Sequence, residues 1–252
     1  MKKIVILFVI AFLQCSHYPK NGIAESNHEN PILVTEIITY KDEKQNINKI
    51  TYNGNKIVSQ NNTDGFIINY TYTGDFITKI EAFDDEQKPY FTHEYTYVNG
   101  KIDTSIYYSY SDDSSTTEFK YTHNADGTVS YDIVYTETSV GLPYVANGKY
   151  TFSNGNLIEA VYSSNDGRKN VVTYKYDKNN NVFKNVVGFN LLLDNKTCSV
   201  NNVVTMTQKL PDINPITTTF VYKYDSKNFP IEAIKTYVDE TSTNINKINY
   251  RY

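Results

Sequence analysis

The sequence predicts an all-β protein, an antiparallel up-and-down meander of Tyr-rich hairpins that curls into a large, closed or incompletely closed β-barrel. The first observation is composition: the 252 residues include 24 Tyr and 12 Phe, with 2 Met and no Trp, and aromatic residues favour strands. The second is a set of turn dipeptides whose residues tolerate positive φ: Asn53-Gly54, Asn99-Gly100, Asp126-Gly127, Asn147-Gly148, Asn154-Gly155 and Asp166-Gly167. The third is an aromatic residue that recurs before the turns.

The recurring unit is clearest at Tyr174-Lys175-Tyr176-Asp177, which leads into an Asn-rich segment predicted to be a turn. The aromatic residues before successive turns align as Tyr52, Tyr72, Tyr97, His123, Phe152, Tyr176 and Tyr224. Their intervals are 20, 25, 26, 29, 24 and 48 residues, and the last interval is interpreted as two ordinary units with one repeat diverged or lost. Roughly two strands per unit make a sheet too wide to stay flat.

Between the turns, side chains alternate as expected for strands with one apolar, aromatic face and one wet face. In residues 104–110, one face carries Ile106, Tyr108 and Tyr110, and the other carries Ser105, Tyr107 and Ser109. In residues 131–136, Tyr131, Ile133 and Tyr135 oppose Asp132, Val134 and Thr136. We expect the first face of each set to be the apolar one.

Residues 1–15 resemble a lipoprotein export signal. Lys2 and Lys3 precede an apolar run of ten residues, Ile4 to Leu13, which is too short to span a bilayer. Cys15 resembles the lipidated cysteine of a bacterial lipoprotein, although Gln14 stands where Gly, Ala or Ser is usual. The alternative is an ordinary cleaved signal with an incidental cysteine. We expect residues 16–31 to be a flexible polar tether and residues 32–252 to be a single repeat-built β domain.

These features predict an exported protein, lipid-anchored to the outer membrane and either periplasm-facing or at the cell surface. The net charge of −4 is spread without blocks, so a nucleic-acid partner is not expected. The chain ends on Tyr252, as outer-membrane barrels often end on an aromatic residue. The mean hydropathy of −0.50 and the charged strands nevertheless favour a soluble barrel over a lipid-embedded one.

Two segments allow alternative interpretations. Residues 184–210 interrupt the pattern, and the apolar stretch 186–193 predicts an insertion, a short helix or plug that fills the core in preference to binding a ligand. Cys198 is expected to be a small buried side chain, with a disulfide to Cys15 as the competing interpretation.

The sequence contains only partial matches to catalytic or metal-binding motifs. Residues 177–181 begin like a calcium loop but have Val182 where Gly is needed. The acidic sequences Asp84-Asp85-Glu86 and Asp112-Asp113 are expected to be solvated loops, with a cation site or a glycosidase pair as the alternative. His123 occupies an aromatic position, which favours packing over metal binding. We predict no catalytic residues, no metal site and no cofactor.

Tyrosines are the best candidates for binding, because they offer large, rigid, amphipathic surface to sugars or proteins. The candidate ligand-binding residues are Tyr95, Tyr97, Tyr108, Tyr110, Tyr174 and Tyr176. The alternative, which we favour, is that these side chains form the core face of the sheet.

The Tyr-x-Tyr-Asp-x-x-Asn form at residues 174–180 and 222–228 resembles the YD repeat of RHS-type proteins. The signal, tether and Tyr-rich hairpins together resemble uncharacterised secreted lipoproteins of Bacteroidetes with a porin-like β-barrel. The resemblance covers roughly residues 32–252 and implies an antiparallel meander, without catalytic residues to carry over. We therefore predict a non-enzymatic cell-envelope lipoprotein that binds or scaffolds a glycan, a peptide or an envelope partner. The alternatives are a purely structural or adhesin-like repeat protein and a glycan hydrolase with a composite acidic site.

Overall fold

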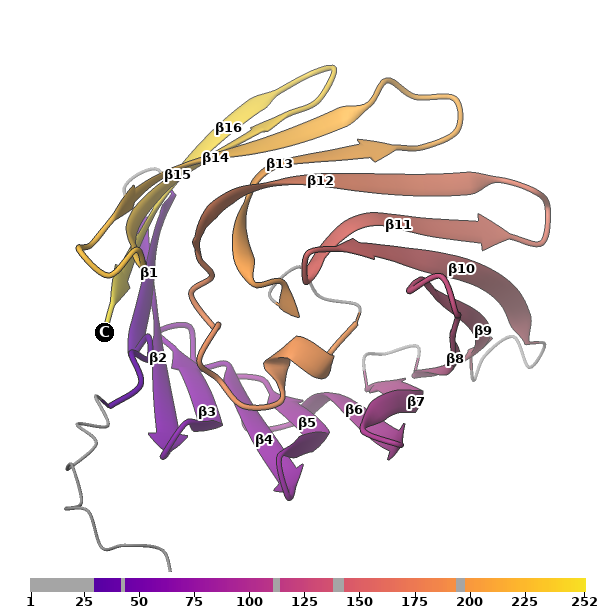
Figure 1. Ribbon diagram of the computed structural model, residues 1–252, viewed down its shortest axis with the longest axis horizontal. Helices are drawn as coiled ribbons and strands as arrows, with labels where there is room; N and C mark the ends of the chain where they lie inside the picture. The colour runs from indigo at the N-terminus through magenta and orange to yellow at the C-terminus, as the bar shows by residue number, and fades with distance from the viewer. Residues whose placement is uncertain (1–29, 42–43, 111–113, 138–142, 194–197) are drawn as a thin grey trace, which may run out of the picture. The chain divides into compact units, whose positions relative to one another are not determined.

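The computed structural model describes residues 30–41, 44–110, 114–137, 143–193 and 198–252. Sixteen antiparallel strands each pair with their neighbours in sequence, and β16 pairs with β1, so the barrel is closed. The predicted all-β, up-and-down barrel is confirmed, and the ring of strands is seen end-on in Figure 1. The strands are β1 (Glu36–Lys41), β2 (Lys44–Asn53), β3 (Lys56–Asn62), β4 (Ile67–Thr73), β5 (Phe76–Phe83), β6 (Pro89–Val98), β7 (Lys101–Ser109), β8 (Ser115–His123), β9 (Val129–Glu137), β10 (Tyr144–Ser153), β11 (Asn156–Ser164), β12 (Lys169–Asn180), β13 (Asn201–Lys209), β14 (Ile216–Tyr224), β15 (Pro230–Val238) and β16 (Thr243–Arg251).

The only helix among the described residues is a single 3₁₀ turn, η1 (Phe189–Leu191). No helix in the described ranges has the length and apolar character needed to cross a membrane.

Most predicted turn dipeptides form turns, but Asn147-Gly148 does not, because it lies inside β10. An added Cβ at Gly148 would lie 2.2 Å from Tyr131 Cζ and 2.3 Å from Val161 O. The Tyr131 ring crosses the strand there and donates its hydroxyl to Val161 O at 3.0 Å. Gly148 is therefore required for close approach and not for turning, which is why the hairpin prediction was wrong at this position.

The inner face of the barrel is apolar and aromatic, as the alternation predicted for β9, where Val129, Tyr131 and Ile133 are buried and Asp132 is exposed. The prediction for β7 was inverted. Ser105, only 1% exposed, faces inward, whereas Tyr108 and Tyr110 lie on the outside. Register is the reason, because Ser105 pairs with the buried Tyr95.

A β-bulge lies beside most of the turns that follow the repeated aromatic residue, and these bulges explain why the residue recurs. In the β4–β5 hairpin, Tyr72 pairs with Ile77 while Thr71 pairs with Lys79, so one residue is extra and the hydrogen-bond ladder is interrupted. One unit later, the Tyr97 hydroxyl donates to Ile77 O at 2.8 Å. The equivalent bonds to bulge residues run from Tyr176 to Leu157 O (2.6 Å), from Tyr252 to Pro230 O (2.9 Å) and from His123 Nε2 to Ile102 O (2.8 Å).

The β8–β9 hairpin is the exception, because it has no bulge. The β8–β9 pairing has no register shift, and the aromatic residue of the next unit is Phe152, which has no hydroxyl to donate. At Phe152 the hydrogen-bonding ring is thus absent where the preceding hairpin has no bulge. Tyr72 and Tyr224 also follow bulged hairpins, but they donate to Val187 O and to Asp177 instead. His123 makes the bond to a bulge carbonyl that tyrosine makes in other units.

Residues 181–200, which we call the plug, leave the end of β12 and enter the ring of strands before β13 begins (Figure 1). Residues 194–197 of the plug lie outside the described ranges. Tyr72 donates to Val187 O at 3.0 Å, and Val187 N donates to Asn55 O at 3.0 Å. Phe183 and Phe189 stack at 4.9 Å within the core cluster, so the predicted core-filling insertion is confirmed.

The plug also corrects the reading of the longest repeat interval. The 48 residues between Tyr176 and Tyr224 hold one ordinary hairpin unit, β13 and β14, plus the plug, and not two units. Cys198, near the end of the plug, is buried as expected.

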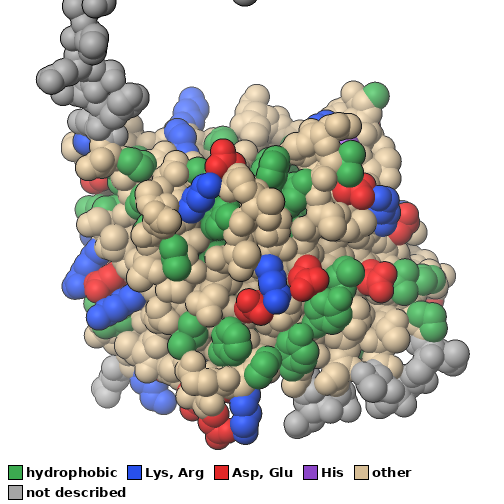
Figure 2. All heavy atoms as spheres, turned by 90° about the horizontal axis from the view of Figure 1, so that it is seen from below, with side chains coloured by type: hydrophobic (Ala, Val, Ile, Leu, Met, Phe, Trp, Pro, Cys, Tyr) green, Lys and Arg blue, Asp and Glu red, His purple; other side chains and the backbone are tan. Residues whose placement is uncertain are grey.

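The outer face of the barrel carries charged side chains in cross-strand ion pairs. Lys223 and Lys247 each lie 2.7 Å from Glu232 and lower the pKa of Glu232 to about 2. Lys120 pairs with Asp103 at 2.6 Å on the opposite part of the wall. Figure 2 shows positive, negative and apolar side chains interspersed on one face of the molecule, with no continuous apolar band.

Candidate functional site

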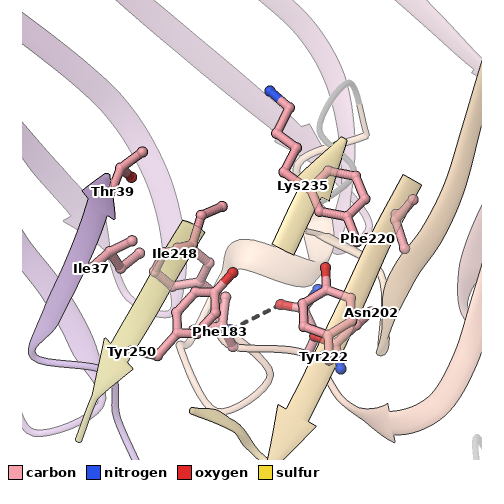
Figure 3. Close-up of a pocket in the computed structure, with 12 residues that line it drawn as sticks. Ile37, Thr39, Phe183, Asn202, Phe220, Tyr222, Lys235, Ile248 and Tyr250 are labelled. Carbon is pink, nitrogen blue, oxygen red and sulfur yellow. Dashed lines mark hydrogen bonds between the residues drawn. The ribbon is translucent and has the colours of Figure 1, made fainter. Parts of the chain in front are cut away.

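A cavity of about 240 Å³ lies between the plug and the inner wall of the barrel. The wall contributes residues from β13, β14, β15, β16 and β1, and most of the lining is apolar or aromatic (Figure 3). The lining residues are Ile37, Thr39, Asn181, Val182, Phe183, Asn202, Val203, Phe220, Tyr222, Lys235, Ile248 and Tyr250. A partly enclosed, mostly apolar pocket with a few polar groups is the usual form of a small-molecule site.

Two tyrosine hydroxyls in this cavity differ from those of the repeated ladder. Within the described chain, neither Tyr222 nor Tyr250 has a hydrogen-bonding partner for its hydroxyl. Burial raises the pKa of both phenols well above the ordinary value, so both stay protonated at neutral pH. They are therefore available as donors to a ligand.

Lys235 is the one cationic side chain that lines the cavity. In Figure 3 its ammonium group points away from Phe183 and from the tyrosine rings. Among the described residues, no carboxylate lies within ion-pair distance of Lys235. The cavity thus has an apolar floor at the plug and a positive charge at its rim.

Asp177, near the end of β12, contacts the cavity residue Asn202. Asp177 accepts hydrogen bonds from the Tyr224 hydroxyl, from Asn179 N at 2.9 Å and from Asn202 N at 3.2 Å. These three donors stabilise the Asp177 carboxylate. The same contacts correct the turn predicted at residues 177–181, because the chain continues as β12 through Asn180 with an irregular register.

The structure does not bring the six predicted binding tyrosines together. Four face inward: Tyr95 is 6% exposed with its hydroxyl 2.8 Å from His93 Nδ1, the hydroxyls of Tyr97 and Tyr176 bond bulge carbonyls, and Tyr174 packs against the core. Tyr108 and Tyr110 instead line an outer groove of about 270 Å³ with Lys79, Glu81 and Glu94. Cys15, the predicted lipidation site, lies outside the described residues.

Among the described residues, the acidic sequence Asp84-Asp85-Glu86 does not form a catalytic or cation-binding arrangement. Asp84 accepts from the backbone N of Glu86 and of Lys88, at 3.0 and 2.8 Å, and so shapes its own loop, whereas Asp112 and Asp113 lie outside the described residues. No group of three or more His, Cys, Asp or Glu side chains able to hold a metal ion occurs in the described ranges.

The residues of the cavity were not identified by sequence reasoning. Tyr222 was visible as part of a repeat and Tyr250 as part of an alternating closing strand, but nothing distinguished them from the structural tyrosines. Lys235 gave no signal at all, because a lysine in a strand is normally on the wet face.

Comparison with protein-family models found no match, and no curated protein matches the sequence. Among solved structures, a porin-like protein from Bacteroides vulgatus ATCC 8482 aligns with 87% of this chain and 98% of its own, with a TM-score of 0.59 and 17% identity. This chain has a porin-like β-barrel fold. A porin-like protein from Bacteroides uniformis ATCC 8492 is also similar, with a TM-score of 0.49, 13% identity, and 86% and 96% of the two chains covered. At such identity the similarity to the first protein shows the fold alone, and it confirms the barrel implied by the resemblance stated above.

Proposed function

We propose that this protein is a non-enzymatic cell-envelope lipoprotein whose barrel binds a small amphipathic molecule in the cavity beside the plug. The observation that carries the proposal is the cavity itself, because its floor is apolar and two donors and one cation remain available to a ligand. A volume of about 240 Å³ is just below the ~300–1,000 Å³ typical of ligand pockets, so the ligand is small.

The charged outer surface of the barrel favours a position in water within the envelope over one embedded in lipid. A lipid-embedded barrel presents an apolar band to the bilayer, whereas this wall carries ion pairs such as Lys223–Glu232 and Lys120–Asp103. Lipidation at Cys15 would then supply the membrane attachment. Replacing Cys15 with Ser should move the protein from the membrane fraction to the soluble fraction, and retention in the membrane would contradict the anchor.

The binding function is tested with a thermal-shift screen of the purified protein against glycans, peptides and small amphipathic acids, alcohols and amines. A ligand that binds only the folded state raises the melting temperature. Ile248→Trp, which narrows the cavity, should abolish the shift. Ile245→Trp is the matched control, because Ile245 lies on the same strand and is 62% exposed. A shift that survives Ile248→Trp would place the ligand elsewhere.

A scaffolding function is the second candidate, and the structural use of most repeat tyrosines favours it. The outer groove at Tyr108 and Tyr110, with its mixed charges, is the surface that a protein or glycan partner would meet. No thermal shift across the screen, together with crosslinking of a partner that is lost in Tyr108→Ala, would support scaffolding over small-ligand binding.

A further inference from the structure

We propose that the ligand of the inner cavity is an anionic amphiphile, whose apolar body lies against the plug and whose carboxylate or similar anion pairs with Lys235 at the rim, with the Tyr222 and Tyr250 hydroxyls as further donors that line the cavity. This inference rests on the proposed binding function and names the chemical class of the ligand. Among the described residues, Lys235, Tyr222 and Tyr250 of the cavity have no partner for their polar groups, whereas Lys79 in the outer groove already pairs with Glu81 at 2.7 Å.

The first argument is the unbalanced cation. Lys235 lines a partly enclosed cavity, and within the described chain no carboxylate neutralises it. A cation beside a partly enclosed apolar surface attracts an anion more strongly than it would in open water. A ligand anion at the rim would neutralise Lys235.

The second argument is the contrast among the tyrosines. The hydroxyls of Tyr97, Tyr176 and Tyr252 are committed to backbone carbonyls. Those of Tyr222 and Tyr250 have no such partner in the described ranges and lie in the cavity (Figure 3). A phenol that stays protonated donates well to a carboxylate, because hydrogen bonds to ionised acceptors are stronger than neutral ones.

The third argument fixes the orientation of the ligand. Asp177 accepts hydrogen bonds from the lining residue Asn202 and so adds negative charge next to it, whereas the Lys235 ammonium group points away from Phe183 and from the tyrosine rings. An anionic group is repelled from the first and attracted to the second. The apolar body then fits between Phe183, Phe220 and Val203, where aromatic rings favour an aryl group.

The test uses three probes with one apolar body: 4-phenylbutyrate, 4-phenyl-1-butanol and 4-phenylbutylamine. Isothermal titration calorimetry with the purified protein should give a dissociation constant for the carboxylate at least about tenfold lower than for the alcohol, with the amine weakest. Lys235→Met keeps the aliphatic stem and removes the charge, so it should abolish the difference between acid and alcohol while leaving alcohol binding unchanged.

Lys247→Met is the matched control, because it removes the same charge from the outer face of the neighbouring strand and should preserve the preference for the acid. The double variant Tyr222→Phe/Tyr250→Phe should weaken the acid about three- to tenfold more than the amine. Circular dichroism confirms that each variant folds.

The outcomes separate the two proposals. If the alcohol binds as tightly as the acid and Ile248→Trp abolishes both, the cavity binds ligands but the anionic class is wrong. If the preference for the acid survives Lys235→Met, the assignment of Lys235 is overturned. If none of the three probes binds, the anionic-amphiphile proposal fails, and a hit elsewhere in the broader screen that Ile248→Trp abolishes would still leave the binding function standing.

Discussion

The hydroxyl of Tyr97 should contribute more to stability than that of an exposed tyrosine in the same sheet. Tyr97→Phe keeps the ring, whose centroid lies 4.8 Å from that of Phe76, and removes only the donor to Ile77 O. Leaving a buried carbonyl at a bulge without this donor costs about 1–3 kcal/mol of unfolding free energy. For a domain of this size that corresponds to a fall of roughly 2–12 °C in melting temperature, at about 2–4 °C per kcal/mol.

The assay is thermal and urea unfolding followed by circular dichroism, with Tyr108→Phe as the matched control. Tyr108 lies on the next strand, on the outer groove, and has no hydrogen-bonding partner for its hydroxyl among the described residues, so its loss should change stability by less than about 0.5 kcal/mol. Equal stabilities of the two variants would refute the claim that bulge carbonyls select tyrosine over phenylalanine in this repeat.

Three further predictions concern packing and pH. Gly148→Ala should lower stability by about 1–3 kcal/mol in the same assay, because its Cβ would overlap the Tyr131 ring; an unchanged melting temperature would contradict the close approach. Phe189→Ala should cost about 3–5 kcal/mol, because Phe189 is 5% exposed and stacks on Phe183, and it should speed proteolysis within the plug; wild-type resistance would count against a packed plug. Burial raises the pKa of Tyr72 and Tyr131 from 10.0 to about 12, so the stability they support is complete below pH 10 and is lost between about pH 10 and 12, when the phenols of the unfolded chain ionise first. Absorbance at 295 nm should show a class of tyrosines that titrates late, and uniform titration near pH 10 with native circular dichroism would oppose this.

Sequence reasoning succeeded where the determinants are local. The turns at Asn99-Gly100 and Asn154-Gly155 follow from residues that accept positive φ, and both residues of each pair have it. Alternation in β9 was predicted correctly because its two faces differ strongly in polarity. In β7 both faces carry tyrosine, so local pattern could not choose between them, and pairing with Tyr95 on β6 decided.

The failures arose from demands made by distant residues. Gly148 looks like a turn glycine, but the need for it comes from Tyr131 and Val161, each more than ten positions away in the chain. The cavity combines Lys235, Tyr222 and Tyr250 from three strands with Phe183 from the plug. Each of these residue types is common in the sequence, and only the closed register makes them neighbours.

The number of strands gives a reason why such a cavity exists. A barrel of about eight strands is filled by its own side chains, whereas one of about 16–18 strands leaves a channel unless something enters it. Here the plug enters from the end where β12 meets β13 and packs Phe183, Val186 and Phe189 into the core. The remaining space lies between the plug and the wall from β13 to β1. It is lined by Tyr222, Tyr250 and Lys235, whose polar groups have no partner within the described part of the chain. If the sole role of the plug were to fill the lumen, apolar residues at these positions would complete the packing at lower cost than one amine and two hydroxyls that line the cavity. Their presence is therefore the strongest structural reason to search for a ligand before a scaffold partner.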